Sequence, residues 1–137
     1  MPRLTLALIL LAAAGCDAAG PPVTTAPVVA AGMGFTTDRD AYRRGETATL
    51  LLRNVSADTL TTGVLECATL ESWTGTAWTA RSSDNDRVCI EIARILAPGE
   101  TMDGAVALDV PEGSYRFVHG LYGQNATPAA TGAFRVE

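Results

Sequence analysis

The sequence contains no lysine and only one histidine, His119, among its 137 residues. All ten basic residues are arginine, and they are not clustered as they would be in an arginine-rich phosphate-binding surface. The formal net charge is −5, which argues against a nucleic-acid partner, because such a partner requires a basic face. A structural zinc site needs about four ligands, which one histidine and a cysteine pair do not supply. We therefore expect no metal, no cofactor and no nucleic-acid partner.

Catalytic motifs are also missing. The chain has no G-x-S-x-G elbow and no glycine-rich loop that could hold a phosphate. His119 alternates with Tyr115, Phe117 and Leu121, a pattern typical of a partly buried structural histidine. A general base needs a positioned partner, and no serine or thiol nucleophile is evident for this one. The sequence therefore predicts a protein without catalytic residues or an evident small-molecule substrate, and an enzyme is the least favoured alternative.

No hydrophobic run is long enough to span a membrane. The longest, residues 4–11, falls short of the roughly 20 residues that a spanning helix needs. It follows a positively charged start at Arg3 and precedes the small residues 12–15, and these three parts together are typical of an export signal.

The end of this segment, Ala13-Ala14-Gly15-Cys16, resembles the lipobox of bacterial lipoproteins. The resemblance implies cleavage before Cys16 by signal peptidase II, and a diacylglycerol and usually a further acyl chain on that cysteine. Ala13 stands where leucine is commonest, and an ordinary secretory signal is the alternative. The expected location is the bacterial cell envelope, lipid-anchored and facing the periplasm or the outer surface. The choice between inner and outer membrane stays open.

Residues 16–32 are rich in proline, alanine, threonine and valine and show no amphipathic period. Proline breaks helices and cannot donate to a sheet ladder, so the composition favours an extended, semi-rigid spacer. We therefore expect a signal peptide over residues 1–15, a lipid-anchored linker over residues 16–32 and one domain over residues 33–137.

Within the domain, short runs of alternating hydrophobicity recur between turn residues. Candidate strands cover residues 33–37, 46–54, 61–73 (as one strand or two), 77–81, 87–95, 101–110, 114–122 and 131–136. In residues 87–95 the alternation places Val88, Ile90 and Ile92 on one face. Pro98-Gly99 suits the centre of a type II turn. This spacing predicts an all-β, antiparallel sandwich of about seven to eight strands.

Four segments of the domain then show a family resemblance. Residues 37–46 (TDRDAYRRGE), 50–54 (LLLRN), 96–100 (LAPGE) and 113–117 (GSYRF) resemble a bacterial immunoglobulin-like family, similar to the proteinase-inhibitor-like sandwiches of bacilli. The resemblance spans most of residues 35–137, but its motifs are structural, so it implies a fold and says little about function. It also implies that Tyr115 is a structural tyrosine whose hydroxyl bonds backbone near the preceding turn.

Lipidation of Cys16 would leave Cys67 and Cys89, 22 residues apart. In an exported protein such a pair is usually bridged, so we predict a structural disulfide. If Val88, Ile90 and Ile92 face the core, Cys89 points outward, and the bridge lies on a sheet surface or the strand is bulged.

Candidate binding residues lie in two polar loops. Asp84, Asn85 and Asp86 form an acidic loop without the spacing of an EF-hand, and Gln124 and Asn125 lie in the loop before the last strand. Trp73, Trp78 and Tyr122 form either a contact patch or part of the core. We expect a non-catalytic immunoglobulin-like module that offers a loop or a sheet edge to an envelope protein. The alternative is a proteinase inhibitor that inserts one of these loops into a protease.

Overall fold

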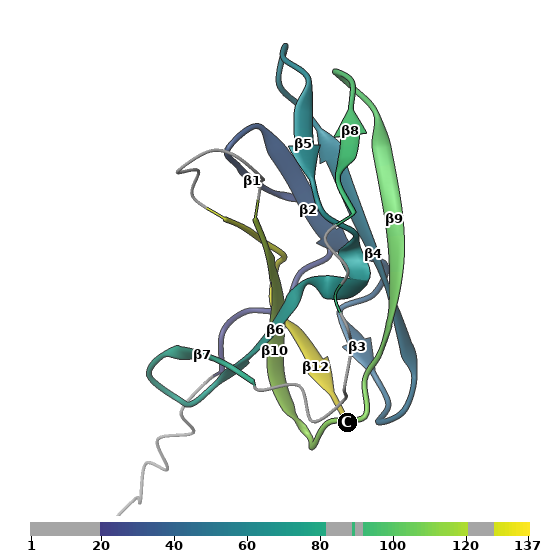
Figure 1. Cartoon of the computed structure of the whole chain (residues 1–137). Helices are drawn as coiled ribbons and strands as arrows, with labels where there is room; N and C mark the ends of the chain where they lie inside the picture. Colours follow the sequence, from purple (N-terminus) through teal and green to yellow (C-terminus); the bar gives the residue numbers. More distant parts are fainter. Residues whose placement is uncertain (1–19, 82–88, 90–91, 121–127) are drawn as a thin grey trace, which may run out of the picture.

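The computed structural model describes residues 20–81, 89, 92–120 and 128–137. These residues are all-β apart from one 3₁₀ turn, η1 (Leu65–Cys67), and two sheets face each other as a sandwich (Figure 1). The predicted fold class is thereby confirmed. In the described part of the chain, no helix has the length and hydropathy needed to cross a membrane.

The first sheet is fully antiparallel and has the strand order β1-β2-β4-β9. Its strands are β1 (Val28–Ala30), β2 (Met33–Thr37), β4 (Thr47–Asn54) and β9 (Thr101–Ala107). The longest ladder joins β4 to β9 and pairs Thr47 with Ala107 at one end and Arg53 with Thr101 at the other.

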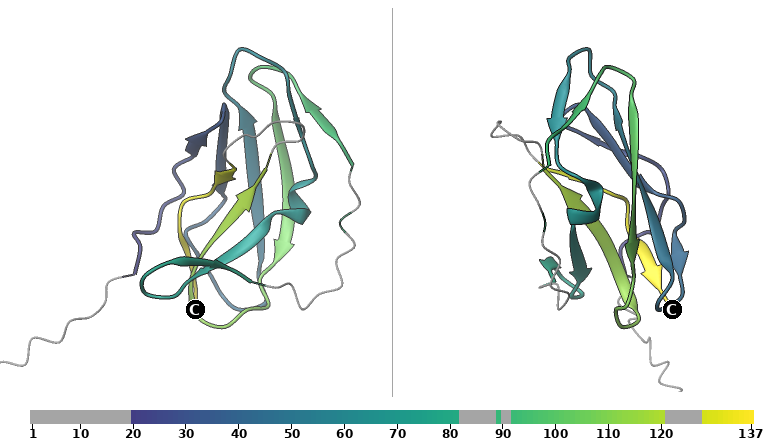
Figure 2. Two further views of the ribbon diagram at one scale, coloured as in Figure 1. Left: turned by 60° about the vertical axis from the view of Figure 1, so that its left-hand side comes forward. Right: turned by 45° about the vertical axis from the view of Figure 1, so that its right-hand side comes forward.

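The second sheet has the order β3-β12-β10-β6-β7, and β11 also pairs with β10. Its strands are β3 (Ala41–Tyr42), β6 (Thr69–Trp73), β7 (Trp78–Ala80), β10 (Gly113–His119), β11 (Ala129–Ala130) and β12 (Phe134–Val136). Its pairs are antiparallel except for β3 and β12, which run parallel. A separate two-stranded ribbon joins β5 (Leu60–Thr62) to β8 (Arg94–Leu96) at one end of the sandwich (Figure 2).

The described residues thus form twelve strands, more and shorter than the seven to eight that the sequence predicted. Predicted segment 61–73 contributes most clearly to this difference. It divides into β5, η1 and β6, because the chain leaves the β5–β8 ribbon, makes one turn and then joins the second sheet.

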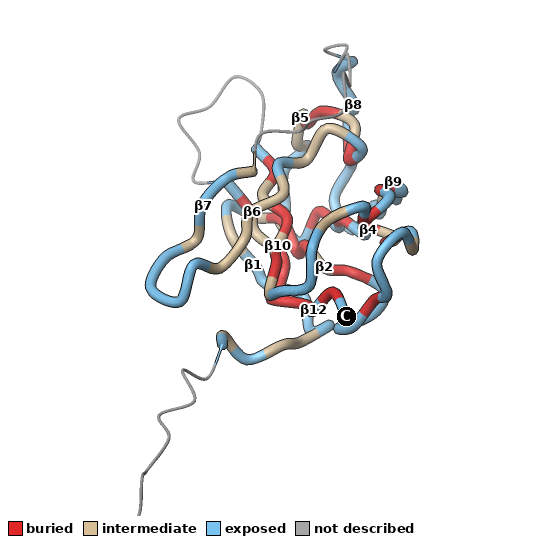
Figure 3. The backbone as a smooth tube through the Cα atoms, turned by 90° about the horizontal axis from the view of Figure 1, so that it is seen from below, coloured by how far each residue is buried: buried red, intermediate tan, exposed pale blue. Residues whose placement is uncertain are grey.

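The core lies between the two sheets, where alternate residues of facing strands are buried (Figure 3). The first sheet contributes Met33, Phe35, Leu50 and Leu52, and the second contributes Tyr115, Phe117, Phe134 and Val136. Phe134 stacks on Phe117 with ring centroids 5.4 Å apart. The period-two alternation from which the sandwich was predicted therefore does supply the buried faces.

The predicted strand over residues 87–95 is confirmed only at Arg94 and Ile95, which lie in β8, and is wrong at the described residues 89, 92 and 93. Ile92 lies outside any strand and is 45% exposed, whereas the buried residue of β8 is Leu96. β8 begins only at Arg94 because its register is set by pairing with β5, where Leu96 lies opposite Leu60. Val88 and Ile90 lie outside the described residues.

The segment expected to be a linker joins the sandwich well before residue 33. Val28–Ala30 pairs with β2 through a two-residue hairpin, in which Ala31 and Gly32 have φ angles of 51° and 77°. Two positive φ angles are the mark of the type I′ hairpin turn, whose twist matches that of the strands. Further upstream, the Thr24 N–H donates to the Ala133 carbonyl at 2.9 Å. The part of the linker from Val23 onward therefore belongs to the domain.

Candidate binding site beside the edge of β9

β9 is the last strand of the first sheet, and half of its backbone polar groups point away from β4. The Glu100 carbonyl accepts from the Asn54 N–H at 2.9 Å, and the Leu108 N–H donates to Glu46 at 2.8 Å. In an antiparallel ladder, residues that bond the partner strand alternate with residues whose polar groups face the other way. The odd-numbered residues Thr101, Asp103, Ala105 and Ala107 therefore direct their N–H and C=O groups to the edge that β4 does not use.

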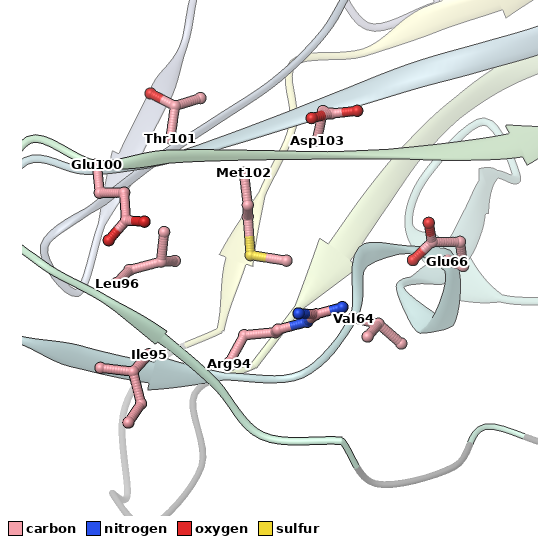
Figure 4. A pocket seen from close by; sticks show the side chains of 9 residues that line it. All are labelled: Val64, Glu66, Arg94, Ile95, Leu96, Glu100, Thr101, Met102 and Asp103. Atoms are coloured by element: carbon pink, nitrogen blue, oxygen red, sulfur yellow. The ribbon is translucent and has the colours of Figure 1, made fainter.

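A pocket of about 360 Å³ lies beside the first part of this edge (Figure 4). It is lined by Val64, Glu66, Arg94, Ile95, Leu96, Glu100, Thr101, Met102 and Asp103. These residues come from β8, from the start of β9 and from the approach to η1. The pocket exists because β8 and β9 diverge after a tight turn, β8 to pair with β5 and β9 to pair with β4.

The lining of the pocket is mixed: Val64, Leu96 and Met102 contribute apolar side chains, but polar and charged groups supply the larger part of its surface. Figure 4 shows the Met102 side chain pointing from β9 toward β8, and the Arg94 side chain pointing back toward β9. Glu100 and Glu66 lie at opposite ends of this space. Glu66 already interacts within the protein. The remaining lining has two carboxylates, those of Glu100 and Asp103, against the Arg94 guanidinium, so its net charge is negative. This chemistry suits a ligand that combines an apolar stem with a basic group.

The turn that separates β8 from β9 has the conformation that the sequence predicted. The Glu100 N–H donates to the Ala97 carbonyl at 3.0 Å, and Gly99 has a φ angle of 80°. Proline and glycine at the two central positions are the residues that a type II turn favours. The Glu100 carboxylate also accepts from the Ala97 N–H at 2.8 Å. One wall of the pocket is thus a rigid turn.

The only histidine lies elsewhere, in the interior. His119 is 7% exposed, and its Nε2 lies 2.6 Å from the Thr62 hydroxyl. Burial lowers the pKa of His119, although a hydrogen bond with the Gly63 backbone opposes this shift. The neutral imidazole joins β10 to β5, which agrees with the structural role expected from its alternation with Tyr115 and Phe117.

The predicted disulfide is present and joins Cys67 to Cys89, whose Cα atoms are 5.7 Å apart. Cys67 ends η1 and is half-buried, and Cys89 is exposed and outside any strand. Neither placement considered from the sequence, a sheet surface or a bulged strand, therefore applies. The bridge fastens the segment that leads into β8 to the turn that leads into β6.

The Tyr115 hydroxyl donates to the Pro111 carbonyl at 2.7 Å, the backbone contact expected for a structural tyrosine near this turn. The other predicted site residues cannot be compared in this way. Cys16, Asp84, Asn85, Asp86, Gln124 and Asn125 all lie outside the described residues, as does Tyr122. The two loops considered for protease inhibition lie largely in the same undescribed ranges.

Sequence reasoning did not find the pocket. Arg94 and Glu100 are ordinary surface residues in a strand pattern, and Met102 reads as a core residue. A weak signal was available, since Leu96-Ala97-Pro98-Gly99-Glu100 predicts a tight turn between two strands. Nothing local indicates that those strands pair with different partners, because that depends on β4 and β5.

No protein-family model matches the sequence, and no curated protein matches it. Among solved structures, the chain is similar to the sporulation control protein Spo0M from Bacillus subtilis. That match has 16% identity and a TM-score of 0.46, over 80% of this chain and 50% of that one. A β-glucosidase from Listeria innocua is similar at 12% identity and a TM-score of 0.37, over 76% of this chain and 16% of that one. The chain therefore spans half the length of Spo0M, and neither similarity bears on its function.

Proposed function

We propose that this protein is a lipid-anchored lipoprotein of the bacterial cell envelope, and that its sandwich is a non-catalytic module for binding a partner protein. The observation that carries the anchor is the run from Leu4 to Cys16, an apolar stretch too short to span a membrane that ends in a lipobox-like Ala-Ala-Gly-Cys. Lipid on Cys16 would hold the domain at a membrane surface.

The disulfide supports an exported destination. Disulfides persist in oxidising compartments such as the periplasm and the cell surface, and they are rare in the reducing cytosol. The Cys67–Cys89 bridge closes a 22-residue separation, and its Cα distance of 5.7 Å lies in the range usual for such bonds. A protein made for the envelope gains stability from this bond, which a cytosolic protein would not keep.

The anchor is tested by blocking two separate steps of lipoprotein maturation, the cleavage before Cys16 and the attachment of lipid to its thiol. Globomycin, which inhibits signal peptidase II, should cause the uncut precursor to accumulate. The Cys16→Ser variant should lose its place in the membrane fraction, because no lipid can then be attached. If no precursor accumulates under globomycin and Cys16→Ser changes neither processing nor the membrane fraction, the lipid anchor is refuted.

The binding role rests on the edge of β9 that no strand in the described part of the chain pairs with, and on its adjoining pocket. An extended segment of a partner can pair with the outward N–H and C=O groups of Thr101 and Asp103, as strands do when they add to a sheet. Such pairing fixes the backbone, and a side chain of the partner then enters the pocket. The acidic surplus of Glu100 and Asp103 over Arg94 favours a lysine or arginine there.

A proline at position 103 tests strand addition directly. The Asp103 N–H faces away from β4, so Asp103→Pro removes no hydrogen bond of the β4–β9 ladder, yet it blocks pairing at the edge. Asp103→Asn removes the charge and keeps the N–H, which makes it the matched control. The measurement is photocrosslinking from a residue installed at Thr101 in intact cells, followed by mass spectrometry. Loss of the captured partner with Asp103→Pro is expected, and equal capture in both variants would refute pairing along this edge.

A further inference from the structure

Because the N-terminal segment packs on the domain, only a few residues separate Cys16 from the first residue that contacts the domain. Gly20 already lies against the domain, since a Cβ at its position would be 3.2 Å from the Ser114 Oγ. Val23 then forms a bridge with Ala133, and Val28–Ala30 joins β2. Only four peptide units separate Cys16 from Gly20, which is a reach of at most roughly 14 Å. A lipid on Cys16 would therefore hold the domain against the bilayer rather than away from it.

The surface nearest to Gly20 is the outer face of the second sheet. In β10 the side chains of Tyr115 and Phe117 are buried, so those of Ser114 and Arg116 point outward. Ser114 touches the start of the described chain, and Arg116 lies two residues further along the same strand. Successive outward residues of a strand are separated by about 7 Å. The N-terminal segment and the surroundings of Arg116 therefore occupy the same part of this face.

Arg116 contacts one member of a tryptophan pair on the β6–β7 hairpin. Its guanidinium lies 4.7 Å from the ring centroid of Trp78, which pairs across the hairpin with Trp73. The two indole rings are 5.3 Å apart, and both side chains are partly exposed. In Figures 1 and 3 this hairpin projects from the end of the sandwich at which the described chain begins.

The charge of Arg116 is compensated locally. Its Nε donates to the Glu71 carboxylate at 2.7 Å, and both side chains are largely shielded from solvent. The face thus presents two aromatic rings with polar N–H edges and an ion pair without net charge. Indole rings favour the boundary between lipid headgroups and hydrocarbon, where the apolar ring is buried and the N–H stays solvated.

We propose that the Trp73–Trp78 hairpin contacts the lipid headgroup region and fixes the orientation of the domain on the membrane that Cys16 anchors. This inference rests on the proposed lipid anchor. The lipid on Cys16 and the indoles of Trp73 and Trp78 then attach the same face of the domain to the membrane. The edge of β9 belongs to the other sheet and stays available to a partner.

The full-length lipidated protein provides its own probe, because Trp73 and Trp78 are its only tryptophans. The protein is reconstituted into vesicles of phosphatidylcholine with a minor fraction of phosphatidylglycerol, and the vesicles are floated on a density gradient. Emission is then compared between vesicles with plain lipid and vesicles with lipid brominated near the carboxyl end of its acyl chains. Loss of roughly half of the emission is expected, because indoles at the interface lie within reach of these bromines.

A relocated tryptophan supplies the control. Arg53 is exposed on the outer face of β4, and the next residue, Asn54, bonds Leu96 of the β5–β8 ribbon. In the variant Trp73→Phe/Trp78→Phe/Arg53→Trp, emission should be the same in both kinds of vesicle. If the wild-type protein floats but its emission is the same in plain and in brominated vesicles, the inference is overturned, whereas the proposed lipid anchor is not. If the wild-type protein does not float, the anchor fails and the inference fails with it.

Discussion

The buried Asn54 amide donates a 2.9 Å hydrogen bond to the carbonyl of Leu96, a residue 42 positions later in the chain. Its second N–H donates to the Asp58 carbonyl at 2.7 Å. Its oxygen accepts from the N–H and the hydroxyl of Ser56, at 2.9 and 2.7 Å. The amide therefore uses its full capacity of two donors and two acceptor positions. It joins the end of β4 to β8, which forms a wall of the proposed binding pocket.

Replacing this amide should be among the costliest substitutions outside the apolar core. Asn54→Ala removes the amide donor from the buried Leu96 carbonyl and breaks the bonds to Asp58 and Ser56, so we expect a loss of roughly 3 kcal/mol in the free energy of unfolding. Ser56→Ala removes a more exposed partner and should cost about 1 kcal/mol. Urea unfolding of both variants measures the difference. Equal losses would show that Asn54 contributes no more than its loop neighbour.

Alkaline pH should weaken the protein through Tyr42. Burial, together with the 2.7 Å hydrogen bond that its hydroxyl donates to Asp38, raises the pKa of Tyr42 to about 12. A tyrosine in the unfolded chain ionises near pH 10. Between about pH 10 and 12 the unfolded state therefore loses this proton first, and stability falls as the pH rises. Tyr42→Phe should flatten that part of the curve of unfolding free energy against pH; an unchanged slope would contradict the assignment.

Mild acid should act through His119. Burial places its pKa below the usual value of 6.5, so the unfolded state binds a proton first as the pH falls. The stabilisation present above about pH 6.5 is then lost as the pH drops toward the lower folded pKa. His119→Gln should reduce this loss, measured by urea unfolding at about pH 7 and pH 5. Thr62→Val is the control, because it removes the 2.6 Å contact but keeps the titrating imidazole. A slope that survives in His119→Gln would assign the effect to another group.

The disulfide should be detectable by mass and by stability. Reduction should add the mass of about two hydrogens to the intact protein, since one S–S bond becomes two thiols. Closing a 22-residue separation is worth about 3 kcal/mol in the chain-entropy model. The double variant Cys67→Ala/Cys89→Ala should therefore unfold at a lower urea concentration, with a loss of roughly 2–5 kcal/mol. An unchanged mass would mean that the two thiols are free.

Features set by neighbouring residues were predictable from the sequence. The turn at Pro98-Gly99 follows from the backbone preferences of those two residues. The buried face of β10 follows from the alternation of Tyr115, Phe117 and His119. Such patterns are local, and so they can be read without knowledge of the partner strand.

Features set by distant partners were not predictable. The register of β8 depends on Leu60, and it buries Leu96 instead of Ile92. The segment before β1 has the composition of a spacer, yet its backbone bonds Ala133. Alternation also shows which side of β9 faces the core, but it does not show which edge of β9 lacks a partner among the described strands. The pocket beside that edge was missed for this reason.

The bridge between Val23 and Ala133 joins two segments that are synthesised at different times. Synthesis proceeds from the N-terminus, so the acceptor for the Thr24 N–H emerges more than a hundred residues after its donor. Until then the Thr24 N–H lacks this acceptor, although β1 can already pair with β2, and the sandwich stays open along that seam. If Cys16 carries lipid as proposed and the chain is threaded through a translocation channel, that end would reach the membrane first, and the seam of the domain would close only as residue 133 arrives.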